Sequence, residues 1–321
     1  MRADERATRM MRLLELLNEQ ERAVPVSELA ELASREFGVS EVTLRSDLTA
    51  LCALFGVRKS ARGTYEAVRG TRGPELAGGS LFATRLQHRA EDKIAIAAAV
   101  AELLGRSGDL RVLLLDAGTT TYYVADRLSE RSGLDLIVWT PSVSAAFRLA
   151  GARGVSVRLL GGELHPDYAV VSGDETARAL RALAGAEAEA APLDAQLPQF
   201  PGTHCVLDVN YIAADGRLYT DESKERLQKR LMADLSEDVT LVADHSKLFG
   251  RRLGLQAHEV YSLEQLRTKR CVRVVTDPNV SDEQTTQLQE LLSRSLGDTR
   301  VDRASGADAL VFTACPSADA V

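Results

Sequence analysis

The feature that most constrains the fold is a regular alternation of helical and buried-strand patterns from about Glu91 onward. A helical pattern over residues 91–106 precedes a short apolar strand, and another helix follows Thr121. Leucine-rich and β-branched runs between helices are typical of a parallel sheet that is covered on both faces. The sequence therefore predicts a Rossmann-like α/β domain with a mostly parallel sheet, whose expected strands are residues 111–115, 136–139, 155–160, 205–213, 239–243, 272–276 and 309–313.

The N-terminal residues follow a different pattern, which predicts a winged helix-turn-helix. Apolar residues at helical spacing predict a first helix over residues 6–18. A second helix is expected from Ser27, a good N-cap, to Gly38, because glycine takes the left-handed conformation that ends helices. Ser40 can then cap a third helix, and residues 57–68 predict a β-hairpin that forms the wing.

The chain has 321 residues, a length that favours two domains. Residues 1–69 are predicted to form the winged helix-turn-helix and residues 91–321 the α/β domain. Residues 70–90 are predicted to form a linker, because four glycines and a proline lie in its first half. Residues 185–201 are rich in alanine, glutamate and proline and are predicted to form a loop insertion.

Residues 39–48, VSEVTLRSDL, predict the DNA-recognition helix of the N-terminal domain. We expect Val42, Leu44 and Leu48 to pack inward and the polar residues of the first turns to face outward. Recognition helices meet base edges and phosphates with those turns. The alternative is a winged helix used for protein contacts. The expected DNA contacts, with the basic residues of the hairpin included, are Ser40, Glu41, Thr43, Arg45, Arg58, Lys59 and Arg62.

The net charge of −7 argues against nucleic-acid binding if it is taken for the whole chain. Residues 1–75, however, contain 12 basic and 12 acidic residues, whereas residues 76–321 contain 27 basic and 34 acidic residues. The excess of acidic residues therefore belongs to the α/β domain. Because phosphate contacts depend on local cations and helix N-termini, a neutral N-terminal domain remains compatible with DNA binding.

The cysteines and the apolar segments predict a protein without a metal, a cofactor or a membrane span. The N-terminus has no uninterrupted apolar stretch of the signal-peptide type, and no segment approaches the ~20 apolar residues of a membrane helix. We therefore expect a soluble, cytoplasmic protein. Four cysteines lie far apart in apolar surroundings and are each predicted to be small buried hydrophobic residues: Cys52, Cys205, Cys271 and Cys315.

A glycine followed by three threonines stands at a predicted strand-to-helix junction in residues 113–125, LLLDAGTTTYYVA. At such a junction Gly118 lets the backbone approach a ligand, and the first helical amides bind an anion. The hydroxyls of Thr119, Thr120 and Thr121 add hydrogen-bond donors. An ordinary N-cap is the alternative interpretation, but three threonines are more than a cap requires.

Three weaker motifs follow farther along the α/β domain. Residues 159–164, LLGGEL, place two glycines after a strand, although a plain turn explains them equally well. In residues 219–232 Glu225 and Lys229 lie four apart on one helix face, a spacing that also suits a solvated ion pair. Residues 241–250, LVADHSKLFG, place polar groups at the carboxyl end of a strand, where open α/β sheets bind ligands.

Together, in this order, the motifs resemble the DeoR family of bacterial transcriptional repressors from about residue 10 to about residue 277. The N-terminal match to the family pattern VSEETIRRDL consists of Val39, Ser40, Glu41, Thr43, Arg45, Asp47 and Leu48. The resemblance implies a sensor domain similar to ribose-5-phosphate isomerase and the CoA transferases, which usually senses a phosphorylated sugar. It implies an effector pocket formed by Asp116, Gly118, Thr119, Thr120, Thr121, Gly161, Gly162, Thr220, Glu225, Lys229 and Lys247.

The chain departs from the family pattern at several positions. Ser46 replaces the second arginine of the recognition helix, and residues 61–66, ARGTYE, replace an HGGA-like run in the wing. In the sensor domain, residues 140–142 (Thr-Pro-Ser) stand in place of Thr-Asn-Ser, and residues 208–211 (Asp-Val-Asn-Tyr) in place of Gly-Ala-Asp-Gly. Arg226 stands where the family has alanine.

The predicted function is a ligand-responsive transcriptional repressor and not an enzyme. Its expected partners are double-stranded operator DNA, a phosphorylated sugar or related anionic metabolite, and further copies of the chain in a homodimer or a dimer of dimers. One alternative is a degenerate member that regulates transcription without a sugar-phosphate effector. The other is an isomerase-like enzyme in which Asp116, Glu225 and Lys247 act as acid or base, whereas His245 is expected to be a structural hydrogen-bond donor.

Overall fold

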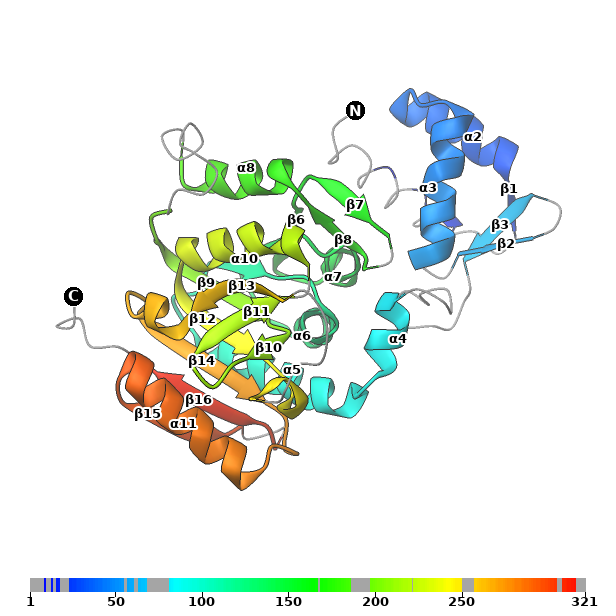
Figure 1. The fold of residues 1–321 in the computed structure, drawn as a ribbon. Coiled ribbons are helices and arrows are strands. Elements are labelled where there is room, and N and C mark those ends of the chain that lie inside the picture. The colour runs from blue at the N-terminus through cyan, green and yellow to red at the C-terminus, as the bar shows by residue number, and fades with distance from the viewer. Residues whose placement is uncertain are drawn as a thin grey trace.

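The computed structural model (Figure 1) has a group of small N-terminal elements and a larger α/β part. It describes residues 9, 13, 16–17, 23–54, 57–60, 63–67, 81–166, 168–185, 197–220, 222–249, 257–304 and 308–315. Arg62, residues 70–80 of the expected linker and most of the insertion therefore lie outside the described residues. Of the helix expected over residues 6–18, only Arg9, Leu13, Leu16 and Leu17 are described, and they are helical.

The N-terminal elements are a helix-turn-helix followed by a β-hairpin, as the sequence predicts. Gly38 ends the first of these helices with φ 63°, and its N–H donates to the carbonyl of Ser34. A short strand before the helices pairs with the hairpin and was missed in the sequence. The elements are β1 (Val24–Pro25), α2 (Val26–Phe37), α3 (Glu41–Leu54), β2 (Val57–Lys59) and β3 (Thr64–Ala67).

The inward orientation predicted for Val42 is wrong. Its side chain is 79% exposed, whereas Leu44, Leu48 and Leu51 are fully buried. At ~100° per residue, the buried leucines, which follow one another at intervals of four and three, form one stripe, and a residue two positions before Leu44 lies on the opposite side of the helix. Val42 therefore belongs to the outward face of α3.

The α/β part is built on an eight-stranded sheet in the order β15-β16-β14-β12-β9-β4-β5-β6. The pairs from β14 to β6 are parallel, which confirms the mostly parallel sheet. The strand expected over residues 205–213 instead begins within the expected insertion and ends earlier. The parallel strands are β4 (Val112–Leu115), β5 (Leu136–Thr140), β6 (Val155–Leu159), β9 (Phe200–Asp208), β12 (Ser236–Val242) and β14 (Cys271–Thr276).

One edge of the sheet is antiparallel and carries a disulfide. The strand β16 (Leu310–Ala314) pairs antiparallel with β14, and β15 (Thr299–Arg303), which the sequence analysis missed, pairs antiparallel with β16. Val272 pairs with Ala314, so Cys271 and Cys315 occupy the next paired position and form a disulfide. The prediction that all four cysteines are unpaired hydrophobic residues is therefore wrong.

Helices cover both faces of the sheet. Successive residues of a strand point to opposite sides, so each strand contributes side chains to both layers of packing. Leu113 and Leu115 pack with α5, α6 and α7, whereas Leu114 belongs to the cluster that includes α10 and α11. The helices are α5 (Ala90–Arg106), α6 (Thr119–Ser129), α7 (Val143–Leu149), α10 (Ser223–Leu235) and α11 (Asp282–Leu296).

Part of the expected linker is helical. Residues 81–87 form α4 (Leu81–Gln87), and the ring of Phe82 packs edge-on against Tyr122 of α6, with the ring centroids 5.9 Å apart.

No helix among the described residues is both long and apolar enough to cross a membrane. The remaining elements are β7 (Glu163–His165), β8 (Val170–Ser172), α8 (Asp174–Leu183), β10 (Tyr211–Ile212), β11 (Arg217–Thr220), η1 (His245–Lys247), β13 (His258–Ser262) and η2 (Leu263–Leu266).

Candidate functional site

A polar cavity of about 270 Å³ lies at the carboxyl ends of β4, β9 and β12. In open α/β sheets the loops that follow the strands converge there, and ligands bind among them. The cavity is lined by Phe82, Arg85, His88, Lys93, Ala117, Gly118, Thr119, Tyr168, Val170, Asp208, Asn210, Glu225, Lys229, Asp244, Ser246 and Lys247.

The threonine run forms the first turn of α6, at one wall of the cavity. Gly118 precedes the helix, and Thr119 lines the cavity. Thr120 and Thr121 are fully buried, and the Thr121 hydroxyl donates to the carbonyl of Gly118 at 3.1 Å. The run therefore supplies one wall residue and two residues that pack the helix onto the sheet.

The centre of the site is a buried ion pair between Lys229 and Asp116, which are 1% and 0% exposed. The Lys229 ammonium also donates to the carbonyl of Asp208 at 3.0 Å and lies 3.4 Å from a carboxylate oxygen of Glu225. Asp116 in turn accepts from the backbone N–H of Asp208 at 3.1 Å. Thr220 donates to Glu225 at 3.3 Å. This network joins the ends of β4, β9 and β11 to α10.

Burial and charge shift the titration of this pair. Burial raises the pKa of Asp116 to about 6, although Lys229 acts in the opposite direction. Burial opposes the charged form of Lys229 as well, but the carboxylates of Asp116 and Glu225 raise its pKa above the ordinary value. The lysine is therefore a permanent cation at the cavity wall.

A second lysine of the site, Lys247, is also paired. Its ammonium lies 2.6 Å from a carboxylate oxygen of Asp208, which is 7% exposed. Asp244 accepts from the N–H and the hydroxyl of Ser246 and fixes the short helix η1 that carries Lys247. Burial acts to raise the pKa of Asp244, but Lys247 and the Ser246 donors lower it below its ordinary value.

A further part of the cavity wall comes from the expected linker and the start of α5, and was not predicted from the sequence. Lys93 on α5 is 5% exposed, and its ammonium donates to the carbonyls of Arg85 and His88, at 2.7 Å for His88. The guanidinium of Arg85 lies 5.2 Å from the centre of the Tyr168 ring. Burial lowers the pKa of Lys93 to about 8, and the charge of Lys247 acts in the same direction. The sequence signal that could have identified Lys93 is a lysine near the start of the apolar helical pattern of residues 91–106.

The structure brings together about half of the predicted effector residues. Gly118, Thr119, Glu225, Lys229 and Lys247 line the cavity. The other predicted residues do not line the cavity: Asp116, Thr120, Thr121, Gly161, Gly162 and Thr220. Four of them, Asp116, Thr120, Thr121 and Thr220, are buried. A side chain on Gly162 would meet the Thr176 hydroxyl at 2.4 Å and the Ser172 carbonyl at 2.6 Å, so this glycine is required by packing on β8 and α8.

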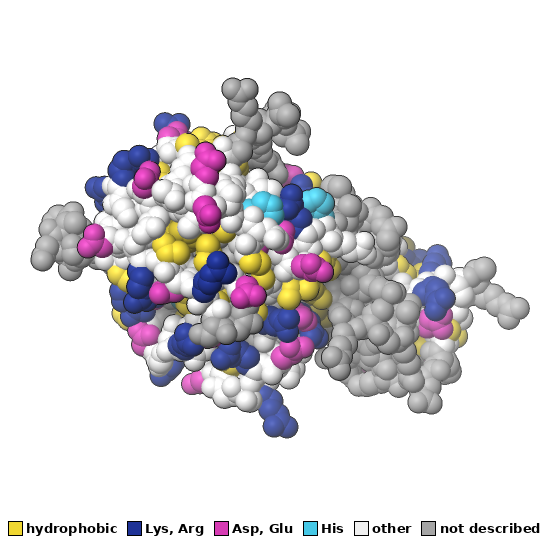
Figure 2. Space-filling view, turned by 90° about the horizontal axis from the view of Figure 1, so that it is seen from below, with side chains coloured by type: hydrophobic (Ala, Val, Ile, Leu, Met, Phe, Trp, Pro, Cys, Tyr) yellow, Lys and Arg dark blue, Asp and Glu magenta, His cyan; other side chains and the backbone are white. Residues whose placement is uncertain are grey.

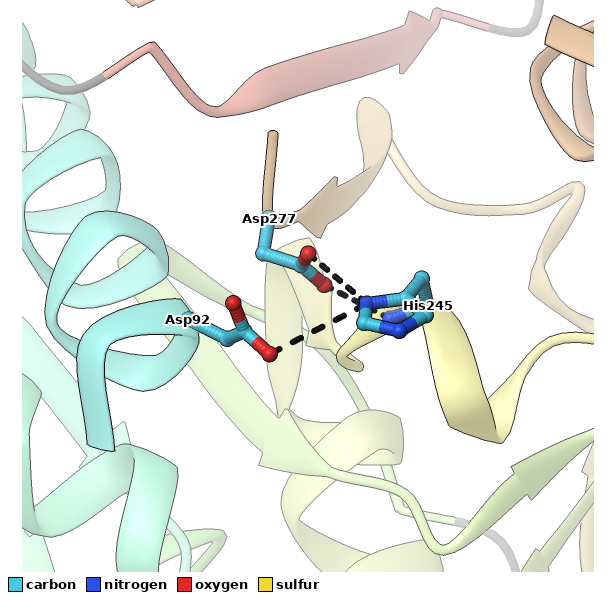
Figure 3. Close-up of side chains that lie close together, drawn as sticks. All are labelled: Asp92, His245 and Asp277. Atoms are coloured by element: carbon cyan, nitrogen blue, oxygen red, sulfur yellow. Dashed lines mark hydrogen bonds and ion pairs between the residues drawn. The ribbon is translucent and has the colours of Figure 1, made fainter. Parts of the chain in front are cut away.

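Asp92, His245 and Asp277 converge beside the cavity (Figure 3). Nδ1 of His245 lies 2.8 Å from Asp277 and 3.9 Å from Asp92, and Nε2 lies 2.9 Å from the guanidinium of Arg89. Because an arginine can only donate, Nε2 accepts and Nδ1 carries the proton that binds Asp277. A metal ion would need that proton to leave and would face Arg89, so the cluster fits a structural clasp better than a metal site.

Comparison with known proteins assigns the family. Residues 88–188 match the family described as DeoR C terminal sensor domain. The chain is 30% identical to the transcriptional repressor AccR of Agrobacterium fabrum over 78% of this chain and 84% of that protein. It is 28% identical to the glycerol-3-phosphate regulon repressor of Haemophilus influenzae, over 72% and 78% respectively. The chain belongs to the DeoR family of transcriptional regulators.

This DeoR-family regulator is also similar, at low identity and low TM-score, to two solved structures. Ribose 5-phosphate isomerase from Plasmodium falciparum is 11% identical over 71% of this chain and 81% of that one, with a TM-score of 0.31. The probable sor operon regulator from Shigella flexneri is 9% identical over 50% and 77%, with a TM-score of 0.30.

The candidate DNA-binding face of the DeoR-family regulator is the outward side of α3. Its exposed side chains are Ser40, Glu41, Val42, Arg45, Ser46 and Thr49, and the hairpin adds Arg58 and Lys59. Ser40 caps the helix by accepting from the Thr43 N–H, and Arg45 pairs with Glu41 at 2.6 Å. On the face that Figure 2 shows, acidic and basic side chains are interspersed.

Proposed function

We propose that this DeoR-family protein represses transcription by binding operator DNA through α3 and the β2–β3 hairpin, and that a phosphorylated sugar or related anionic metabolite in the cavity modulates this binding. The observation that carries the proposal is the presence, in one chain, of a recognition helix with an exposed polar face and a cavity lined by cations at the strand ends. Relatives are named repressors, one of them of a glycerol-3-phosphate regulon. A homodimer or a dimer of dimers, in a soluble cytoplasmic protein, completes the proposal.

Val42 and Arg45 are proposed to read the operator. An arginine can donate two hydrogen bonds to guanine, and an exposed apolar side chain suits the methyl group of thymine. In the free protein Glu41 holds the Arg45 guanidinium at the helix surface, where both side chains are about half exposed. A base or phosphate therefore competes with a weak surface ion pair.

We expect Arg45→Ala to weaken operator binding by about 1–3 kcal/mol, because the arginine contributes base or phosphate contacts. Fluorescence anisotropy with a duplex from upstream of its own gene measures the effect. Arg106→Ala is the matched control, since Arg106 forms the same i,i+4 pair with Glu102 on a helix of the α/β part. If the wild-type protein binds this duplex no tighter than a scrambled one, the repressor proposal is wrong.

The helix α4 is proposed to couple the cavity to DNA binding. Phe82, Arg85 and His88, on α4 or just after it, contribute to the cavity wall, and Lys93 holds the carbonyls at the carboxyl end of α4. An anion that attracts the Lys93 ammonium weakens those two hydrogen bonds. Because α4 lies between the DNA-binding elements and the sheet in the chain, such a rearrangement gives the ligand different affinities for two states, as coupling requires.

We expect Lys93→Met to abolish the response to anionic ligands and, because it removes the same two hydrogen bonds to the end of α4, to change operator affinity in the direction in which the ligand changes it. Thermal shift with glycerol 3-phosphate and a panel of pentose and hexose phosphates measures the first, and release from the operator duplex the second. A ligand at 100 times its Kd stabilises by about 2.7 kcal/mol. Because the pKa of Lys93 is about 8, the ligand-induced shift should shrink as the pH rises through 8. A response that survives in Lys93→Met contradicts the coupling.

Binding without turnover completes the proposal. The three groups that the isomerase-like alternative would use as acid or base are all engaged in ion pairs, Asp116 and Glu225 with Lys229, and Lys247 with Asp208. Each pair would have to open before its members could exchange a proton with a substrate. Conversion of a pentose or hexose phosphate by the purified protein would contradict this part.

A further inference from the structure

The carboxylate of Asp208 lies where the N-terminus of α6 would receive an anion. We propose, resting on the effector cavity proposed above, that Asp208 is a built-in anion that determines ligand specificity: it excludes the ligand's acidic group from α6, accepts hydrogen bonds from ligand hydroxyls, and directs the acidic group to Lys93 and Arg85. The chemical class is thus a polyol that carries a single phosphate or carboxylate.

The position of Asp208 is fixed from three directions. Its backbone N–H donates to Asp116 at 3.1 Å, and its carbonyl accepts from Lys229 at 3.0 Å. Its carboxylate accepts from Lys247 at 2.6 Å. A Cβ added to Gly118 would lie 2.2 Å from the other carboxylate oxygen, so the carboxylate rests directly against the backbone that begins α6. The side chain therefore fills the space in front of this helix.

The charges of the cavity also favour the exclusion of a ligand's acidic group from the N-terminus of α6. The N-terminus of a helix carries a partial positive charge that favours an anion, and here Asp208 supplies it. A ligand phosphate at that position would face the carboxylate across a short distance beside buried side chains, where like charges repel more strongly than in water. Lys229 and Lys247 each have a carboxylate within ion-pair distance.

The α4–α5 side of the cavity offers cations with weaker partners. The hydrogen bonds of the Lys93 ammonium go to two backbone carbonyls, and Arg85 stacks on Tyr168. Both side chains line the cavity, and Lys93 is 5% exposed. An acidic group gains more here than beside a lysine that is already paired, because a partly desolvated cation binds an anion strongly.

Isothermal titration of the full chain with inorganic phosphate tests the proposal. We expect Asp208→Gly to raise phosphate affinity about tenfold or more, because it removes a negative charge, opens the space at Gly118 and frees Lys247. Asp208→Asn keeps most of the volume and should give a smaller increase. Asp302→Asn, which removes a carboxylate paired with Arg300 on β15, should leave the affinity unchanged. Lys93→Met should abolish phosphate binding in the wild-type background.

Two outcomes overturn different claims. If the wild-type protein binds phosphate but Asp208→Gly binds it no tighter, the role of Asp208 is wrong and the effector cavity stands. If no variant binds phosphate, the anionic effector of the proposed function is wrong, and the role proposed for Asp208 is wrong as well. Operator binding is measured separately and does not enter either result.

A stability measurement tests the contact itself. Gly118→Ala should lower the melting temperature in the wild-type background, because the added methyl group meets the Asp208 side chain. The same substitution should be tolerated in Asp208→Gly, where that side chain is absent. If Gly118→Ala is equally harmful in both backgrounds, Asp208 does not fill the space in front of α6.

Discussion

Replacing Lys229 with methionine is expected to lower the free energy of unfolding of the α/β part by about 3–5 kcal/mol. The substitution leaves the Asp116 carboxylate buried without its cation, and the carbonyl of Asp208 loses a donor. For a unit of this size, such a loss corresponds to a fall in melting temperature of roughly 6–20 °C. Urea denaturation followed by circular dichroism measures the free energy, and a thermal scan measures the shift.

Lys224→Met is the matched control for this prediction. Lys224 lies on the same helix and pairs with Glu163 at 3.1 Å, but both side chains are more than half exposed. Its replacement should cost less than about 1 kcal/mol, because surface ion pairs contribute little. A further Asp116→Asn substitution should recover part of the loss in Lys229→Met, since no uncompensated charge is then buried. Equal losses for the two lysines would show that Lys229 is not a buried partner of Asp116.

The pH dependence of the Lys229→Met deficit has a definite sign. Burial already raises the pKa of Asp116 to about 6 while Lys229 is present, and removing the lysine raises it further. A group whose pKa is raised in the folded state stabilises the fold below its unfolded pKa and loses that contribution as pH rises through the folded value. The deficit should therefore be smaller at pH 5 than at pH 8.

The parallel sheet follows from local patterns in the sequence, because apolar strands alternate with helices. The centre of the site follows only in part: the spacing of Glu225 and Lys229 places both on one face of α10, but the family resemblance, and not the spacing, implied that they share a pocket with Asp116 at the end of β4. These features are predictable because strand ends of a parallel sheet converge, whichever residues lie between them in the chain.

The cavity wall formed by α4 could not be predicted in the same way. Residues 70–90 have the composition of a linker, and the helix within them depends on the packing of Phe82 against Tyr122. Lys93 becomes a cavity residue only because that packing places two carbonyls beside it. The antiparallel pair of β15 and β16, and with it the Cys271–Cys315 disulfide, likewise depends on which edge of the sheet the last strands join.

Replacing Arg9 with methionine is expected to abolish operator binding and to lower the stability of the N-terminal elements by about 3–5 kcal/mol. Arg9 and Asp47 form an ion pair at 2.6 Å in which each side chain is 1% exposed. Because Asp47 lies on α3, the pair anchors the proposed recognition helix to Arg9, in the helical segment that precedes α2. Losing the arginine removes a buried cation beside Asp47, on the element that is proposed to present Val42 and Arg45 to DNA. Fluorescence anisotropy with the operator duplex and proteolysis of the N-terminal elements measure the two effects.

Glu66→Gln provides the control, since Glu66 forms an exposed ion pair with Arg58 in the hairpin at 3.2 Å. It should change stability by less than about 1 kcal/mol and leave the fold of α3 intact. Phosphate binding in the cavity should be unaffected by Arg9→Met, because none of the cavity residues belongs to the N-terminal helices. Loss of phosphate binding together with DNA binding would mean that the whole chain has unfolded, and the anchoring role of the pair would then be rejected. Retained operator affinity in Arg9→Met would reject it as well.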